Sequence, residues 1–122
     1  MRILYVEDNT ELRETIGMLM EGEGQTVTAC ATAEEALVHD GQQTFDLLFL
    51  DVSLPGMSGT DLARRLLARD PTRWVVLCSG YELGGYPSSW GPNVRTLLKP
   101  FELEELEQLL ASIEEAVGSQ SA

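Results

Sequence analysis

The sequence is poor in basic residues and in long apolar runs. Eight lysines and arginines stand against 20 aspartates and glutamates, so the formal charge is -12 at neutral pH. This charge disfavours direct binding to nucleic acids and to anionic membranes. No run approaches the roughly 18 apolar residues of a membrane-spanning helix, and the N-terminus lacks a signal-peptide cleavage site. We therefore expect a cytoplasmic protein that binds a cation, a metal ion or another protein.

Cysteine is also scarce. Cys30 and Cys78 are too few for a disulfide framework and are not clustered as metal ligands are, so we interpret both as small buried apolar residues. A length of 122 residues corresponds to about one domain, and no internal repeat or linker interrupts it. We expect a domain over residues 1–117 and a flexible polar tail over 118–122.

The apolar residues alternate between strand-like and helix-like spacing along the chain. Five short runs predict strands, at Arg2–Val6, Thr26–Cys30, Asp46–Asp51, 74–78 and Val94–Leu98. Helical spacing occurs in four segments, over Leu12–Met20, from Thr32 to Gly41, from about Thr60 to Arg69 and from Glu102 to Val117. This alternation predicts an α/β fold, a doubly wound parallel sheet with helices on both faces.

Polar side chains stand where four of the predicted strands end. Glu7 and Asp8 follow the first strand, Asp51 ends the third, Ser79 follows the fourth, and Lys99, the only lysine, follows the fifth. In sheets of this kind, ligands bind at the carboxyl ends of the strands. We therefore expect these five side chains to meet at one edge of the sheet.

Such a meeting of charges restricts the chemistry. Three carboxylates within a few ångströms repel one another unless a cation lies between them. Oxygen ligands suit Mg²⁺ or Mn²⁺ and do not suit zinc. Lys99 can hold a phosphoryl oxygen as a compact charge, while Ser79 and backbone amides supply further donors. The group predicts a carboxylate nucleophile that receives a phosphoryl group with the help of a metal.

Four motifs at these strand ends identify a family resemblance. The segments "ILYVEDN", "DLLFLDVSLPGMSG", "VVLCSGY" and "LLKPF" occur in this order, and together they resemble the response-regulator receiver domain of two-component signalling. The resemblance covers almost the whole chain. It implies a flavodoxin-like fold whose five strands lie in the order 2-1-3-4-5, an order that places Cys30 and Cys78 too far apart for a disulfide.

The resemblance also implies a role for each site residue. Asp51 is implied as the phosphoacceptor, and the metal ligands are Glu7, Asp8, Asp51 and the backbone carbonyl of Ser53. The residues implied to engage the phosphoryl group are Ser79, Lys99 and the backbone amide of Gly80. In this family the peptide bond between the lysine and the following proline is often cis.

Partners follow from the same resemblance. The phosphoryl group is implied to come from a histidine kinase or a histidine phosphotransfer protein, and phosphorylation is implied to switch a surface that binds a downstream protein, which the sequence does not identify. No enzymatic activity is implied beyond self-phosphorylation from a phosphodonor and autodephosphorylation.

The sequence departs from the family between the fourth and fifth strands. Thr96 occupies a position where the family carries Tyr or Phe, so the usual relay between a hydroxyl and an aromatic ring is not expected here. Residues 80–92, "GYELGGYPSSWGP", contain four glycines and two prolines, which disfavour a helix. We predict that the fourth helix is short, displaced or missing. Tyr81, Tyr86 and Trp90 then either pack this loop onto the domain or form a partner surface that responds to phosphorylation.

Two other functions remain open at the level of sequence. A receiver-like module that is never phosphorylated would bind partners only, and its Asp51 would simply start a loop. A haloacid-dehalogenase-type phosphatase also uses a strand-end aspartate and Mg²⁺. That family places a second aspartate two residues after the nucleophile, where this sequence has Ser53.

Overall fold

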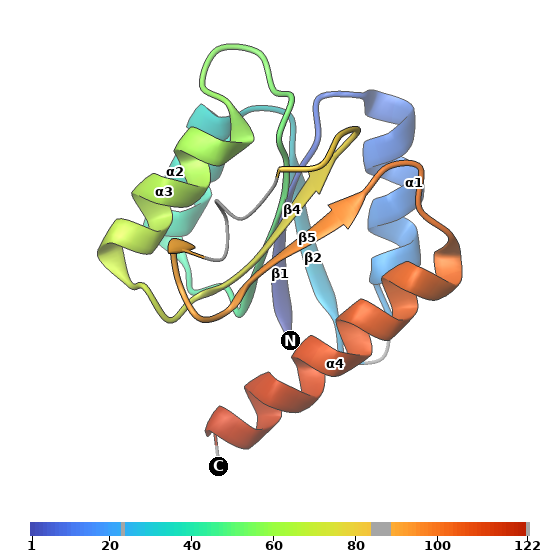
Figure 1. Cartoon of the computed structure of the whole chain (residues 1–122), viewed down its shortest axis with the longest axis vertical. Helices are drawn as coiled ribbons and strands as arrows, with labels where there is room; N and C mark the ends of the chain where they lie inside the picture. The colour runs from blue at the N-terminus through green and yellow to red at the C-terminus, as the bar shows by residue number, and fades with distance from the viewer. Residues whose placement is uncertain (23, 84–88, 122) are drawn as a thin grey trace.

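The computed structural model is a parallel sheet between two layers of helices (Figure 1). It describes residues 1–22, 24–83 and 89–121. The strands are β1 (Arg2–Val6), β2 (Thr26–Cys30), β3 (Leu47–Asp51), β4 (Trp74–Ser79) and β5 (Val94–Leu98), and the helices are α1 (Thr10–Met20), α2 (Ala33–Gln42), α3 (Gly59–Arg69) and α4 (Leu103–Ser121). The strand order is β2-β1-β3-β4-β5, as the family resemblance implied.

Alternation along the strands divides the core into two halves. Leu48 and Leu50 of β3 face the helices α2 and α3, whereas Leu47 and Phe49 face α1 and α4. All four are buried, because a central parallel strand is covered on both faces. The uninterrupted apolar run that precedes Asp51 follows from this position in the middle of the sheet.

Side-chain caps start three of the helices where the sequence provides them. Asn9 accepts a hydrogen bond from the Leu12 amide (3.0 Å), Thr32 from the Glu35 amide (3.1 Å) and Ser58 from the Asp61 amide (3.2 Å). Each bond satisfies an amide that has no partner within its helix. The caps Asn9 and Ser58 lie in the loops that follow β1 and β3, so they fix the helices that leave the carboxyl edge of the sheet.

The connection from β4 to β5 departs from a regular alternation of strand and helix. None of its described residues, 80–83 and 89–93, lies in an α-helix, as predicted from its glycines and prolines. Trp90 packs against the core beside α3, and the Arg64 guanidinium lies 5.8 Å from the centroid of its ring. Trp90 therefore anchors the connection, whereas Tyr81 is 59% exposed. Tyr86 lies outside the described residues.

Two features of the helices differ from the sequence expectation. The helix α4 continues to Ser121, through residues that we expected to form a polar tail. The domain boundary after residue 117 stays a prediction. In α1, Met20 is buried, but Leu12 and Leu19 of the same apolar stripe are 42% and 48% exposed. None of the helices in the described part of the chain is long and apolar enough to cross a bilayer.

Gly59, the first residue of α3, allows that helix to approach β3. Its amide donates to the Val52 carbonyl (3.0 Å), and a Cβ at this position would lie 1.9 Å from the carbonyl oxygen of Asp51. We expect Gly59→Ala to lower the free energy of unfolding by about 2 kcal/mol or more, the scale of overpacking a rigid site. Urea denaturation followed by circular dichroism measures this change.

Gly17 supplies the matched control for this prediction. It lies within α1, and a Cβ there would meet no atom within 4 Å. Gly17→Ala is expected to raise the free energy of unfolding by about 0.5–1 kcal/mol through helix propensity alone. Equal effects of the two substitutions would contradict the close approach at Gly59.

Candidate functional site

The backbone ladder of the sheet continues past the strand ends and positions the site. The Glu7 amide donates to the Cys30 carbonyl (3.1 Å), the Val52 amide to Cys78 (2.9 Å) and the Lys99 amide to Ser79 (2.7 Å). The ladder thereby extends to the residue just beyond each of β1, β3 and β5. Where β1 pairs with β3, the last paired residues are Val6 and Leu50, so the next residue of each segment, Glu7 and Asp51, is a carboxylate at the same level.

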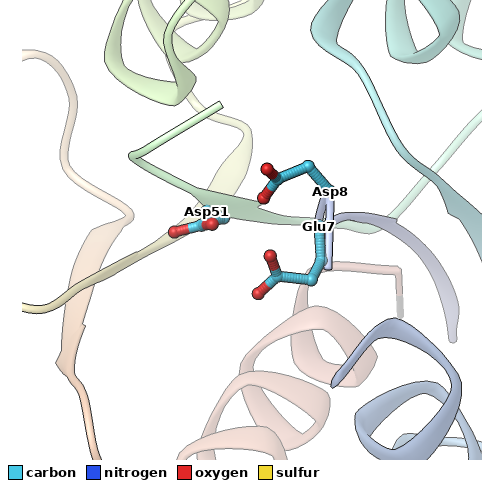
Figure 2. Close-up of side chains that lie close together, drawn as sticks. All are labelled: Glu7, Asp8 and Asp51. Atoms are coloured by element: carbon cyan, nitrogen blue, oxygen red, sulfur yellow. The ribbon is translucent and has the colours of Figure 1, made fainter. Parts of the chain in front are cut away.

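Three carboxylates meet at this edge, as the strand ends predicted. One oxygen from each of Glu7, Asp8 and Asp51 lies within 4.8 Å of the others. Figure 2 shows Glu7 and Asp8 reaching from the end of β1 toward Asp51 at the end of β3. Glu7 and Asp51 are only 3% and 5% exposed, whereas Asp8 faces solvent. Two acids of the group are therefore removed from the water that would screen their repulsion.

Lys99 compensates part of this charge. Its Nζ atom lies 3.2 Å from Glu7 Oε1 and 3.1 Å from Asp51 Oδ1. Burial alone would lower the pKa of Lys99, but the hydrogen bond and charge of Asp51, together with the charge of Glu7, raise it. The lysine therefore remains protonated, and one ammonium group bridges the two buried acids.

Glu7 has a pKa above its ordinary value. Burial is the main cause, the Asp51 charge adds to it, and the hydrogen bond from the Asn9 amide (3.2 Å) and the charge of Lys99 oppose it. One positive charge thus does not fully compensate the negative charge of the carboxylates. A divalent cation would remove the remaining repulsion between them.

The donor set fits a hard divalent cation. The group offers carboxylate oxygens only, with no nitrogen or sulfur ligand among them, and such ligands suit Mg²⁺ or Mn²⁺. Cys78, which pairs with Asp51 in the β3–β4 register, does not change this donor set, because burial raises the pKa of its thiol to about 12. Cys30 and Cys78 are both buried and free, as predicted.

The remaining predicted residues lie outside the acidic group and its ion pairs with Lys99. The Ser53 amide is 3.4 Å from Asp51 Oδ1, and its side chain is exposed. The Ser79 hydroxyl donates to the Tyr81 carbonyl (2.7 Å) and accepts from the Tyr81 amide (3.1 Å). Its single proton is thus engaged within the loop. Gly80 and Thr96 are exposed. The structure brings together Glu7, Asp8, Asp51 and Lys99, and leaves the serine turned toward its own loop.

Two supporting residues escaped the sequence analysis. The Asn9 amide donates to Glu7 Oε2 while the Asn9 side chain caps α1. Arg13 Nη1 donates to the Glu7 carbonyl (2.9 Å). The signal was present, since an asparagine follows the acidic pair and an arginine stands one helical turn later. Both orient the backbone and the carboxylate of Glu7.

A cavity of about 420 Å³ opens beside Asp51. The residues that line it are Tyr5, Glu7, Leu12, Ile16, Phe49, Asp51, Cys78, Lys99, Pro100 and Phe101. The peptide bond between Lys99 and Pro100 is cis, as the resemblance implied. Asp51 is therefore buried in the sheet edge and yet borders a space that a reacting group can enter.

Comparison with known proteins gives a consistent result. A family model described as the response regulator receiver domain matches residues 3–111. The two-component response regulator PhoP of Pseudomonas aeruginosa is 32% identical over 121 residues, which cover 93% of this chain and 51% of PhoP. The chain therefore spans about half the length of that relative.

Solved structures agree with this result. A receiver domain described as CheY-like from Methylobacillus flagellatus is 30% identical, with a TM-score of 0.80 over 92% of this chain and 97% of that one. The response regulator TrrA of Thermotoga maritima, solved in complex with Mg²⁺ and BeF, is 26% identical, with a TM-score of 0.78 and coverage of 92% and 97%.

The acidic group predicts a selective loss of metal binding. Asp8→Asn removes one of the three carboxylates, so we expect Mg²⁺ to bind about tenfold more weakly or worse, since even indirect partners of metal ligands contribute that much. Isothermal titration measures the affinity. Glu11→Gln, which removes an exposed acid of the first turn of α1 outside the group, should leave it nearly unchanged. An equal loss in both variants would indicate general charge attraction instead of a site.

Proposed function

Because the chain belongs to the response regulator receiver domain family, we propose that Asp51 accepts a phosphoryl group from a phosphohistidine. The observation that carries this proposal is the meeting of three carboxylates with the only lysine of the chain at one edge of the sheet. The two apolar clusters that cover the faces of the sheet do not include these charged groups. Their close placement is explained by a reaction that handles a metal ion and a phosphate together.

In the proposed transfer, one oxygen of Asp51 attacks the phosphorus of the phosphohistidine. The new oxygen–phosphorus bond forms as the nitrogen–phosphorus bond breaks, and the imidazole leaves with the bonding pair and takes up a proton. The product is an acyl phosphate on Asp51. The cavity beside Asp51 gives the donor its approach, and the buried sheet edge holds the attacking oxygen in place.

Glu7, Asp8, Asp51 and the carbonyl of Ser53 would hold Mg²⁺ or Mn²⁺. When bound, the ion supplies positive charge that stabilises the oxygens of the transferring group. The fit is supported by the oxygen-only donor set and by the Mg²⁺ and BeF in the related TrrA. Asn9 and Arg13 keep Glu7 oriented for this role through its carboxylate and its carbonyl.

Lys99, Ser79 and Gly80 receive the phosphoryl group. Lys99 already contacts Asp51 Oδ1, so a short movement of its ammonium brings it to a phosphoryl oxygen. The amide of Gly80 donates from the backbone. The Ser79 hydroxyl has one proton to give, and it must leave the Tyr81 carbonyl to give it to the phosphoryl group.

The proposed partners follow from this chemistry. A cytoplasmic histidine kinase or histidine phosphotransfer protein supplies the phosphoryl group, and a downstream protein recognises the phosphorylated state. The charge of -12 disfavours direct contact with nucleic acid by this domain. The domain acts as a switch, and the only reactions it carries out are its own phosphorylation and the hydrolysis of its own acyl phosphate.

The proposal predicts the result of labelling with a small phosphodonor. Wild-type protein incubated with acetyl phosphate and Mg²⁺ should gain the mass of one phosphoryl group, and Asp51→Asn should gain none, because an amide is not a nucleophile. The near-isosteric side chain should leave the fold intact by circular dichroism. Asp61→Asn, an exposed acid in the first turn of α3, is the matched control and should be labelled like the wild type.

Each of the other functions gives a different result. A phosphatase would release phosphate steadily without accumulating label, and an interaction module would do neither. Label of unchanged yield in Asp51→Asn would reject Asp51 as the acceptor.

A further inference from the structure

The cavity beside Asp51 combines an apolar body with a charged wall. Its volume of about 420 Å³ lies within the roughly 300–1,000 Å³ that small-molecule sites occupy. Its apolar walls come from β1, β3, α1 and the segment after β5, and they include Tyr5, Leu12, Ile16, Phe49 and Phe101. Its charged wall is formed by Glu7, Asp51 and Lys99, which the ion pairs of Lys99 hold together. The cavity therefore offers space for a molecule that is itself part apolar and part charged.

The Tyr5 hydroxyl is a polar group of this cavity that the fold leaves without a partner. Tyr5 is 3% exposed, and its ring packs edge-on against Phe49, with 5.4 Å between the centroids. Its hydroxyl makes no hydrogen bond to any other residue that the structure describes. Burial, reinforced by the charges of Glu7 and Asp51, raises its pKa, so the hydroxyl stays protonated and uncharged. Buried hydroxyls usually have a hydrogen-bond partner, and the proposed phosphoryl transfer provides none here.

The charged wall favours a cation as the ligand. Two carboxylates stand beside one ammonium group, so the lining residues carry one net negative charge. Lys99 and the Ser53 amide bond to Oδ1 of Asp51, and Oδ2 accepts no hydrogen bond from the described residues. The aromatic walls add to this preference, because a cation is attracted to the face of a ring. A protonated nitrogen can therefore satisfy the free carboxylate oxygen, whereas an anion would be repelled by the acids.

We propose that this cavity binds a small amphipathic amine, a molecule that carries one protonated nitrogen on a compact apolar body. The nitrogen donates hydrogen bonds to the carboxylates of Glu7 and Asp51 and to the oxygen of the Tyr5 hydroxyl. The apolar body lies between α1 and the sheet, against the rings of Phe49 and Phe101. Charge-assisted hydrogen bonds fix the orientation of the ligand, and burial of its apolar body supplies affinity.

Binding of the amine and binding of Mg²⁺ oppose each other in this proposal. Under the function proposed above, the ion is held by Glu7 and Asp51, and the ammonium group uses the same two acids. Two cations at shared carboxylates repel each other, so each lowers the affinity of the other by the same factor. The amine would thus act as an antagonist of the metal-loaded domain. Only this opposition rests on the proposed function, because the ligand site itself needs no metal ion and no phosphoryl group.

Three probes with the same apolar body test the site. Phenylbutylamine is a cation at neutral pH, phenylbutanol is neutral and phenylbutyrate is an anion. Isothermal titration of the full chain in buffer with a chelator measures their affinities in the absence of a metal ion. The amine should bind at least about tenfold more tightly than the alcohol, the scale of one hydrogen bond to a charged group, and the carboxylate should bind most weakly. Equal binding of the three probes, or tightest binding of the carboxylate, would overturn the proposal.

Removal of one hydroxyl locates the amine in the cavity. Tyr5→Phe keeps the ring and should weaken binding of the amine about three- to tenfold, the scale of one hydrogen bond. Tyr81→Phe is the matched control and should bind like the wild type, because its ring is 59% exposed and lies outside the cavity. If Tyr5→Phe does not fold, nuclear Overhauser contacts from the bound amine to the methyl groups of Leu12 and Ile16 locate it in the wild type. Equal affinities of the two tyrosine variants, or no such contacts, would contradict a ligand in this cavity.

Titrations with Mg²⁺ separate this inference from the proposed function. Saturating Mg²⁺ should weaken the amine at least about fivefold in the wild type, the lower range of measured couplings between sites, and an unchanged affinity would overturn the opposition. Asp8→Asn changes the one acid of the group that does not line the cavity and that faces solvent. It should therefore lose Mg²⁺ affinity but bind the amine within about fivefold of the wild type. If Mg²⁺ does not bind the wild type, the proposed metal site fails, whereas binding of the amine in chelator still supports the ligand site. A loss of amine binding in Asp8→Asn as large as the loss of Mg²⁺ binding would overturn the ligand site in favour of general charge attraction.

Discussion

The ammonium group of Lys99 between Glu7 and Asp51 is the interaction on which the site depends. It lies 3.2 Å and 3.1 Å from the two carboxylates, and it brings together residues from opposite ends of the sequence. Without a cation at this point, two nearly buried acids would repel each other, and at least one would take up a proton. In the function proposed above, the same bridge would hold these acids close together before a metal ion or a phosphoryl group is bound.

The sheet makes this bridge possible, because parallel strands end at a common edge and the ladder continues one residue past them. The sequence was sufficient to predict this part. Apolar runs ending in Asp51 and in Lys99 predict buried strands with polar termini, and the parallel arrangement then places these termini together. The strand order and the cis bond before Pro100 came from the family resemblance alone. Asp8 was predicted beside Glu7, although only the structure shows that one is exposed and the other buried.

The spacing of apolar residues could not predict side-chain directions or loop contacts. The stripe in α1 predicts one apolar face, but how far neighbouring elements cover it depends on their tilt, and Leu12 remains partly exposed beside the cavity. The Ser79 hydroxyl is bonded to Tyr81, two residues further along, because a serine hydroxyl readily closes on the backbone of its own turn. Its role toward a phosphoryl group stays a prediction. Glycines and prolines did predict the lack of helix in the described residues after β4. They could not predict that Trp90 would pack beside α3.

The central claim is that the acids and the lysine at this edge form one phosphoacceptor site whose product is an acyl phosphate on Asp51. An acyl phosphate has a distinctive reactivity, because borohydride reduces it to an alcohol and converts the aspartate to homoserine. The most direct measurement is therefore borohydride trapping of protein treated with a phosphodonor and Mg²⁺, followed by peptide sequencing by mass spectrometry. We predict homoserine at residue 51 and at no other aspartate. Homoserine at another residue, or none in protein that has demonstrably taken up a phosphoryl group, would contradict the account.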